Sequence, residues 1–362
     1  MTALPHTPPA TSGRSRARLL GTALLLLGTG GLLLGASVGS TGLDSVFNAR
    51  HDPVAWQIVW DIRLPRTLGA WLAGALLGLA GAVAQGLFRN PLADPYLLGS
   101  ASGAALAVAL TFAGVGAAGL VSSGSGGSGG SGAALAQAAS PWLARLGLTG
   151  AAFVGALLGV LLTLMLAQGV QQTLRLLLAG VVVGYVLGAA RDLVQIADPD
   201  VLTAMQGFTL GITGFVGWSA CAIMAAVLAP LLAGAWALAR VLDALTLGEA
   251  TAQSLGLPLA PLRALLVAVL ALATGTAVAQ TGLIGFVGLV APHLVRGLAR
   301  STHGPLLLLS ALAGGLLLML ADIAARVLMA PQELPVGVLT AVLGGVYLLW
   351  RMHAQSRAGR AH

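Results

Sequence analysis

The feature that most constrains this chain is a series of ten apolar segments separated by short polar connections. They cover residues 19–38, 67–87, 97–120, 147–168, 174–196, 218–240, 262–281, 283–299, 305–326 and 334–351. A helix of about 20 apolar residues crosses the hydrocarbon core of a bilayer. Since 57% of the residues are hydrophobic and 8% are charged, no soluble globular class fits. The sequence therefore predicts an all-α, polytopic bundle of about ten transmembrane helices.

The polar stretches divide the chain into one membrane domain and two short tails. We expect a disordered cytoplasmic N-terminus over residues 1–13, a membrane domain over 14–351 and a cytoplasmic tail over 352–362. Within the membrane domain, the Ser/Gly tract 122–132 predicts a flexible external loop. The stretch 243–260 predicts a cytoplasmic loop between the sixth and seventh spans.

The distribution of arginines predicts the orientation in the membrane. With ten crossings and the N-terminus inside, 12 of the 18 arginines lie on the cytoplasmic side and 6 outside, as the positive-inside rule requires. We therefore expect both termini in the cytoplasm and a multi-pass protein of the bacterial inner (plasma) membrane. On the outer side, Asp198-Pro-Asp200 predicts the start of a short interfacial helix over 201–210.

The basic residues also exclude some chemistry, because all 18 are arginine and none is lysine. A nucleotide-binding P-loop needs a lysine to reach the phosphates. The chain is therefore not expected to be an enzyme or to bind a cofactor, and any ATP is hydrolysed on a separate subunit. Because the arginines alternate with apolar spans, they predict no nucleic-acid surface despite the net charge of +7.

Several polar and glycine-rich motifs interrupt the apolar runs in a specific order. They are Arg63–Arg66, Gln85–Pro95, Leu98–Ala104, Gly248–Gly256, Gly285–Arg296, Ala321–Arg326 and Glu333–Gly337. As a set they resemble the FecCD-type permease subunits of ABC importers for iron-siderophores, haem or cobalamin. The resemblance covers most of the chain.

This resemblance implies a type II importer permease with ten helices. Such a subunit forms a homodimer in the lipid membrane, lines a central pathway with its partner and binds two cytoplasmic ABC ATPase subunits. A periplasmic substrate-binding protein delivers the ligand. The implied function is transport of a metal chelate from periplasm to cytoplasm, with iron-siderophore or haem ahead of cobalamin.

The resemblance further implies that Arg63, Arg66 and Arg326 dock the binding protein through acidic residues on its two lobes. Arginine suits this role because its guanidinium pairs with a carboxylate through two parallel hydrogen bonds. Two alternatives stay open. Arg63 and Arg66 can anchor a helix end at the membrane surface, and Arg326 can pair with Asp322, four residues earlier on one helix.

The motif Gly248–Gly256 lies in the cytoplasmic loop, where the family's coupling helices press on the ATPase. We expect Gly248, Glu249, Ala252 and Gly256 to form this coupling contact. The alternative is an ordinary amphipathic connector between two spans.

Four further polar residues, Gln85, Asn90, Asp94 and Asp322, lie near membrane depth. Polar groups there form buried hydrogen bonds or line a pathway, and the sequence does not separate the two. No metal site is expected, because His293 has no ligand-type residue at suitable spacing.

Two other functions compete with the permease. An ion-coupled secondary transporter would place ionisable residues in mid-span, whereas the centres of these spans are nearly uncharged. An intramembrane serine protease would need a nucleophile such as Ser102 and a base such as His293 within hydrogen-bond reach. The spacing of these residues does not favour that reaction.

Overall fold

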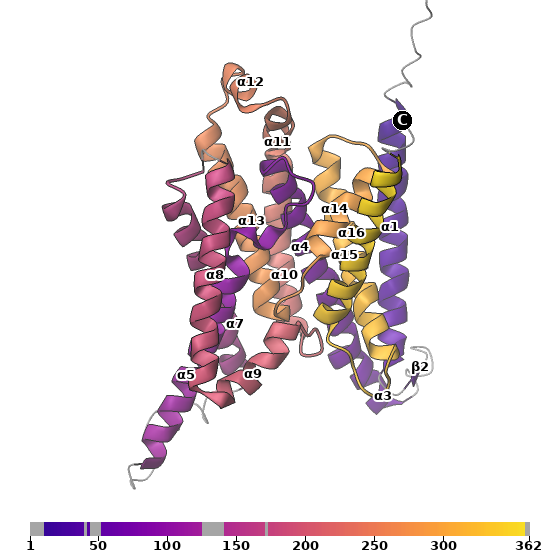
Figure 1. Ribbon diagram of the computed structural model, residues 1–362. Coiled ribbons are helices and arrows are strands. Elements are labelled where there is room, and N and C mark those ends of the chain that lie inside the picture. Colours follow the sequence, from indigo (N-terminus) through magenta and orange to yellow (C-terminus); the bar gives the residue numbers. More distant parts are fainter. Residues whose placement is uncertain (1–10, 40–41, 44–51, 125–140, 171–172, 359–362) are drawn as a thin grey trace, which may run out of the picture.

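The computed structural model describes residues 11–39, 42–43, 52–124, 141–170 and 173–358 as a helical bundle (Figure 1). Two short strands pair antiparallel after the first helix, Val38 with Leu43 and Gly39 with Gly42. The elements are α1 (Thr11–Ser37), β1 (Val38–Gly39), β2 (Gly42–Leu43), α3 (Pro53–Ile58), the π-helix η1 (Val59–Arg63), α4 (Leu64–Leu87), the 3-10 helix η2 (Pro95–Leu98), α5 (Ser100–Gly124), α7 (Pro141–Leu166), α8 (Thr173–Ala197), α9 (Pro199–Leu210), α10 (Trp218–Ala237), α11 (Ala239–Thr246), α12 (Glu249–Ser254), α13 (Leu259–Thr281), α14 (Val287–Leu298), α15 (His303–Val327) and α16 (Val336–Ala358).

Each of the ten predicted apolar segments overlaps one main helix of the bundle, and the sixth also reaches the start of α11 at Ala239. By length and composition, seven helices of the described chain are able to cross a membrane. Three shorter apolar helices, at 100–114, 287–298 and 336–350, complete the set over the described residues. The predicted all-α membrane architecture is therefore confirmed.

The helix α4 forms the centre of the bundle and packs against α15 along a seam of glycines. A Cβ atom added at Gly74 would clash with the carbonyl oxygen of Gly314, and one at Gly78 with that of Ser310. Small residues let helix backbones approach closely in lipid, where dispersion contacts drive association. The seam therefore explains why the second apolar segment carries so many glycines.

A second glycine seam joins α5 and α7. Gly103 and Gly155 face each other so closely that a Cβ atom on either would clash with the other's carbonyl oxygen. Gly159 lies in the same way against the carbonyl of Gly99. Both helices carry the small-residue spacing of four that favours close crossing.

The eighth apolar segment is too short to cross a bilayer as a helix. The helix α14 has 12 residues, about 18 Å at 1.5 Å per residue, and begins four residues later than predicted. The preceding backbone at 282–286 is irregular, and the Leu283 amide donates to the Phe208 carbonyl at 2.9 Å. Irregular backbone is tolerated at membrane depth where protein surrounds it.

The predicted tails and loops are covered only in part. The helix α1 begins at Thr11, so residues 11–13 are helical, and residues 1–10 lie outside the described chain. The Ser/Gly tract starts inside α5, which runs to Gly124, and 125–132 lie outside the described residues. The interfacial helix is present as α9, with Asp198 as its N-cap accepting from the Asp200 amide at 3.0 Å.

The connections gather at two opposite ends of the bundle. In Figure 1, α3 and α9 lie at the lower end, whereas α11, α12 and the C-terminus lie at the upper end. These two ends are the ones predicted to be external and cytoplasmic. We name them the α9 end and the α12 end.

The α4–α15 seam generates a stability prediction. Gly78→Ala should lower the melting temperature of the detergent-solubilised protein, because overpacking a close contact costs about 1–3 kcal/mol. Gly188→Ala on α8 is the matched control, since a Cβ atom there has nothing within 4 Å. Differential scanning fluorimetry compares the two variants. Equal melting temperatures would contradict the seam.

Candidate functional site

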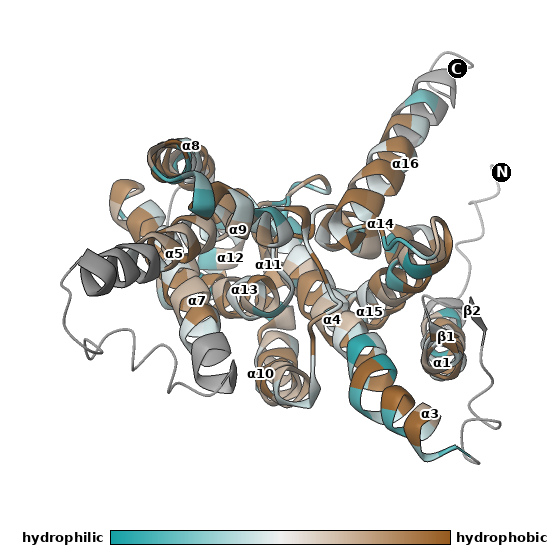
Figure 2. Ribbon diagram, turned by 90° about the horizontal axis from the view of Figure 1, so that it is seen from below, coloured by the Kyte–Doolittle hydropathy of each residue, from teal (hydrophilic) through white to brown (hydrophobic). Residues whose placement is uncertain are grey.

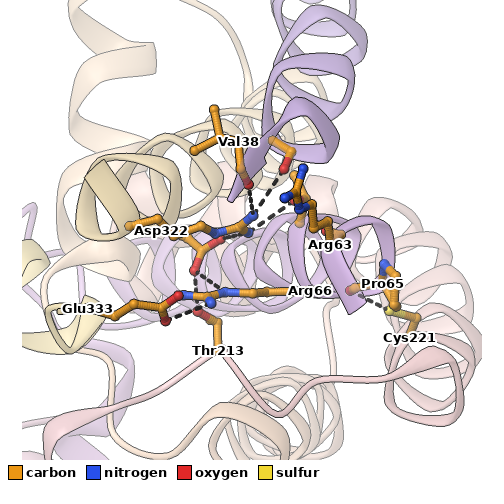
Figure 3. A network of polar contacts seen from close by, with 11 residues as sticks. Val38, Arg63, Pro65, Arg66, Thr213, Cys221, Asp322 and Glu333 are labelled. Atoms are coloured by element: carbon orange, nitrogen blue, oxygen red, sulfur yellow. Dashed lines mark hydrogen bonds and ion pairs between the residues drawn. The ribbon is translucent and has the colours of Figure 1, made fainter. Parts of the chain in front are cut away.

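The α9 end contains a buried carboxylate that three other side chains contact. Asp322 on α15 is fully buried and accepts a hydrogen bond from Nε of Arg66 at 3.1 Å. It also accepts from the hydroxyl of Thr213 and from Nη2 of Arg326. Figure 3 shows Arg66, Asp322 and Thr213 converging from α4, α15 and the segment before α10. We call Asp322, Arg66, Arg326 and Thr213 the Asp322 network.

Further contacts engage the two arginines of the network, of whose nitrogens only Nε of Arg326 is buried without a hydrogen-bond partner in the described chain. Nη1 of Arg66 lies 2.7 Å from Oε2 of Glu333, whose side chain is about one-third exposed. Arg326 donates to the backbone carbonyl of Gly35 at 3.0 Å and to the hydroxyl of Thr67 at 3.0 Å. A buried charge is tolerated when it is paired and hydrogen-bonded. The network therefore ties the end of α1 to α4 and α15.

The sequence predicted docking roles for Arg63, Arg66 and Arg326, and these three side chains differ in how far they are buried. Arg66 is 8% exposed and Arg326 is 2% exposed, so both would have to leave internal partners before meeting another protein. The pair of Arg326 with Asp322, the alternative left open by the sequence, is formed. Arg63 is half-buried, and its guanidinium lies beside Gly39. Docking stays a prediction, and Arg63 is its most accessible part.

At the α12 end, Glu249 organises the predicted coupling motif. Its carboxylate lies 2.7 Å from Arg263 at the start of α13 and 3.5 Å from Arg89 after α4. Gly248 and Gly256 bracket the short helix α12 with positive φ angles of 104° and 77°, a conformation that favours glycine. The motif is therefore a short helix between two glycine turns, and its acidic residue pairs with two arginines of the bundle.

The surface of this loop differs from the predicted one. Ala252 is fully buried and packs into the core of the bundle, so it seats α12 on the bundle and is not on the surface of the loop. Leu247 and Leu255, on either side of α12, are 65% and 62% exposed. Sequence reasoning missed these two leucines. The only signal for them was their position next to the two motif glycines.

The remaining polar residues of the prediction make local or interhelical bonds. Gln85 donates to the carbonyl of Leu289 at 3.1 Å and accepts from Arg296, which joins α4 to α14. Asn90 and Asp94 each accept from a backbone amide two residues later, at 2.9 and 2.8 Å. These three residues, like Asp322, therefore form hydrogen bonds inside the protein, which is one of the two roles that the sequence left open. A role in lining the pathway stays a prediction.

The Asp322 network generates a second prediction. Asp322→Asn leaves Arg326 and Arg66 without their shared carboxylate, and breaking a buried pair in this way costs about 3–5 kcal/mol. We expect a large fall in melting temperature. Asp192→Asn is the control, because Asp192 forms an exposed pair with Arg191 of a kind that contributes about 0–1 kcal/mol. A comparable fall for both variants would show that the network contributes no special stability.

The chain matches a known protein family and two named relatives over most of its length. The model of the FecCD transport family matches residues 23–354. The hemin transport system permease protein HmuU of Yersinia pestis is 37% identical over 94% of this chain and 96% of its own. The vitamin B12 import system permease protein BtuC of Salmonella paratyphi A is 40% identical over 83% of this chain and 84% of its own.

A solved structure supports the same conclusion for the fold. A metal-chelate type ABC transporter in an inward-facing conformation superposes with a TM-score of 0.76 and 27% identity. The match covers 91% of this chain and 97% of that one. The chain therefore belongs to the FecCD transport family and is a permease of that family.

Proposed function

We propose that this chain is the membrane subunit of an ATP-driven importer that moves a metal chelate from periplasm to cytoplasm. The observation that carries the proposal is the family match over residues 23–354. The names of the two relatives, which transport hemin and vitamin B12, favour a metal-containing macrocycle. An iron-siderophore belongs to the same chemical class of bulky metal chelates.

The partners that we propose are a cytoplasmic ABC ATPase and a periplasmic substrate-binding protein. The chain has no lysine and therefore no P-loop of its own. The exposed leucines beside α12 support an ATPase contact at the α12 end, because exposed apolar side chains on an ordered loop suit a groove on a partner. The α12 end and both termini would then face the cytoplasm.

A second copy of the chain is the partner that we propose within the membrane. The helices α8 and α16 flank one side of the bundle (Figure 2) and expose large apolar residues. Tyr185 and Ile196 on α8 are 78% and 79% exposed, and Leu349 on α16 is 67% exposed. A homodimer across this side would enclose a central pathway. Membrane lipid covers the other faces.

The competing functions lose their support with the family assignment. An ion-coupled secondary transporter and an intramembrane serine protease were both compatible with apolar spans alone. The family match and the fold of a metal-chelate type ABC transporter favour neither.

Uptake measurements test the proposed function directly. The chain, its ATPase and its binding protein are reconstituted in proteoliposomes, and accumulation of hemin, a ferric siderophore and cobalamin is measured with and without internal ATP. We expect ATP-dependent uptake of one class and no ATP hydrolysis by the chain alone. Uptake that follows an ion gradient without ATP would overturn the proposal.

The coupling surface gives a third prediction. Leu255→Ser should weaken capture of the ATPase and lower substrate-stimulated hydrolysis several-fold, while the permease still inserts and folds. Leu328→Ser is the matched control, because Leu328 is 61% exposed and follows α15 at the opposite end of the bundle. Co-purification and phosphate release report the effect. Normal ATPase capture by Leu255→Ser would remove α12 from the coupling surface.

The docking surface gives a fourth prediction. Arg63→Glu should weaken binding-protein affinity, because a like-charge contact costs several kcal/mol whereas one exposed pair contributes only ~0.2–1 kcal/mol. The wild-type affinity should also fall as salt rises, since the screening length is about 8 Å at physiological strength. Arg191→Glu, at the same end of the bundle, is the control. Equal affinities for wild type and Arg63→Glu in nanodiscs would leave Arg63 as a structural residue.

A further inference from the structure

The helix that contains α3, η1 and α4 is longer than a bilayer crossing requires. It runs without a break from Pro53 to Leu87, 35 residues, or about 52 Å at 1.5 Å per residue. The hydrocarbon core of a bilayer is about 30 Å thick. Part of this helix therefore lies beyond the core.

A tryptophan contact fixes where the core ends. Trp218 is the first residue of α10, whose 20 residues match the thickness of the hydrocarbon core. Its ring centroid lies 5.2 Å from that of Trp60, and its indole N–H donates to the Trp60 carbonyl at 3.0 Å. Trp60 therefore marks the core boundary. The seven residues 53–59 before Trp60 add about 10 Å of helix at this boundary.

This extension carries apolar residues that the rest of the described chain does not cover. Val54, Ile58 and Ile62, spaced four apart, are 66%, 40% and 54% exposed. Trp56 stacks on Trp60 with ring centroids 6.4 Å apart. The polar residues Gln57 and Asp61 are exposed as well, and the extra residue in the turn of η1 sets them on a stripe next to that of Val54, Ile58 and Ile62.

The orientation of the extension indicates what covers its exposed apolar residues. Figure 2 views α8, α10 and α13 nearly end-on but α3 side-on, projecting away from the bundle. It projects on the side opposite α8 and α16, so a second copy packed on those helices would not cover it. Tryptophans gather at membrane–water interfaces, where their rings sit at the headgroup level.

We propose that residues 53–62 form an interfacial helix that lies in the headgroup and acyl boundary of the leaflet at the α9 end. The stripe of Val54, Ile58 and Ile62 then faces acyl chains, and Gln57 and Asp61 face water. Residues 52–62 contain two aspartates and no arginine. Anchoring therefore relies on apolar burial and tryptophan, and does not depend on anionic lipid.

The single cysteine of the chain makes this proposal directly testable. Cys221 is buried and donates to the Pro65 carbonyl at 3.1 Å, so Cys221→Ser keeps that bond and gives a cysteine-free background. Spin labels are placed by Val54→Cys, Ile58→Cys and Ile62→Cys, with Gln57→Cys and Asp61→Cys as matched controls. The full-length chain is reconstituted in nanodiscs of phosphatidylcholine or of phosphatidylcholine with phosphatidylglycerol.

Collision with oxygen, which is enriched in acyl chains, is compared with collision with a water-soluble nickel chelate. We expect labels at 54, 58 and 62 to favour oxygen by several-fold and those at 57 and 61 to favour nickel, equally in both lipids. High nickel accessibility at all five positions would overturn the proposal. Protection from both reagents at 54, 58 and 62 would overturn it in favour of a protein contact. A preference for oxygen at 54, 58 and 62 that appears only with phosphatidylglycerol would overturn the proposal that anchoring does not depend on anionic lipid.

Discussion

The buried carboxylate of Asp322 is the interaction on which the α9 end of the molecule depends. It receives hydrogen bonds from Arg66, Thr213 and Arg326, which belong to segments far apart in the sequence. Charges in a low-dielectric interior are stabilised only when their partners have good geometry. Through Arg326 the network also holds the carbonyl of Gly35, which fixes where α1 ends. One acidic residue thus sets the relative positions of α1, α4 and α15.

The glycine seam and the network constrain the same pair of helices in different ways. Gly74, Gly78 and Gly314 let α4 and α15 approach closely. Close contact alone does not prevent the two helices from sliding along each other. The bond from Arg66 to Asp322 opposes such sliding at one end. At the other end of α4, Gln85 is bonded to Leu289 and Arg296. The central helix is therefore apolar in its middle and fixed by polar contacts near both ends.

Much of the fold was predictable because hydropathy determines it. Lipid requires about 20 apolar residues per span, so ten segments and the cap at Asp198 were visible in the sequence. The start of α14 was not, because the irregular backbone at 282–286 is as apolar as a helix and is held by distant partners, the Phe208 carbonyl and the Tyr96 hydroxyl. Long-range pairing also escaped prediction, since nothing local connects Arg66 with Asp322. The pair of Arg326 with Asp322 was visible because the two residues are four apart on one helix.

The candidate sites were predictable as motifs but not as surfaces. The glycines at 248 and 256 indicate turns, and the structure gives both positive φ angles. Which face of α12 meets the core depends on tertiary packing, and the buried residue is Ala252 rather than the flanking leucines. The same holds for the docking arginines, whose exposure depends on whether a buried acid lies within reach. Residue type and order identify a family, whereas burial decides which of its residues are free to act.

The π-helix η1 explains how one helix serves two different environments. The Leu64 amide bonds to the Val59 carbonyl, five residues back, so the helix takes one extra residue in this turn. That extra residue rotates α4 relative to α3. Before the turn, Ile58 faces outward, and after it nearly every residue of α4 is buried. Because no loop separates the two parts, α3 and Arg66 of the Asp322 network belong to one continuous helix.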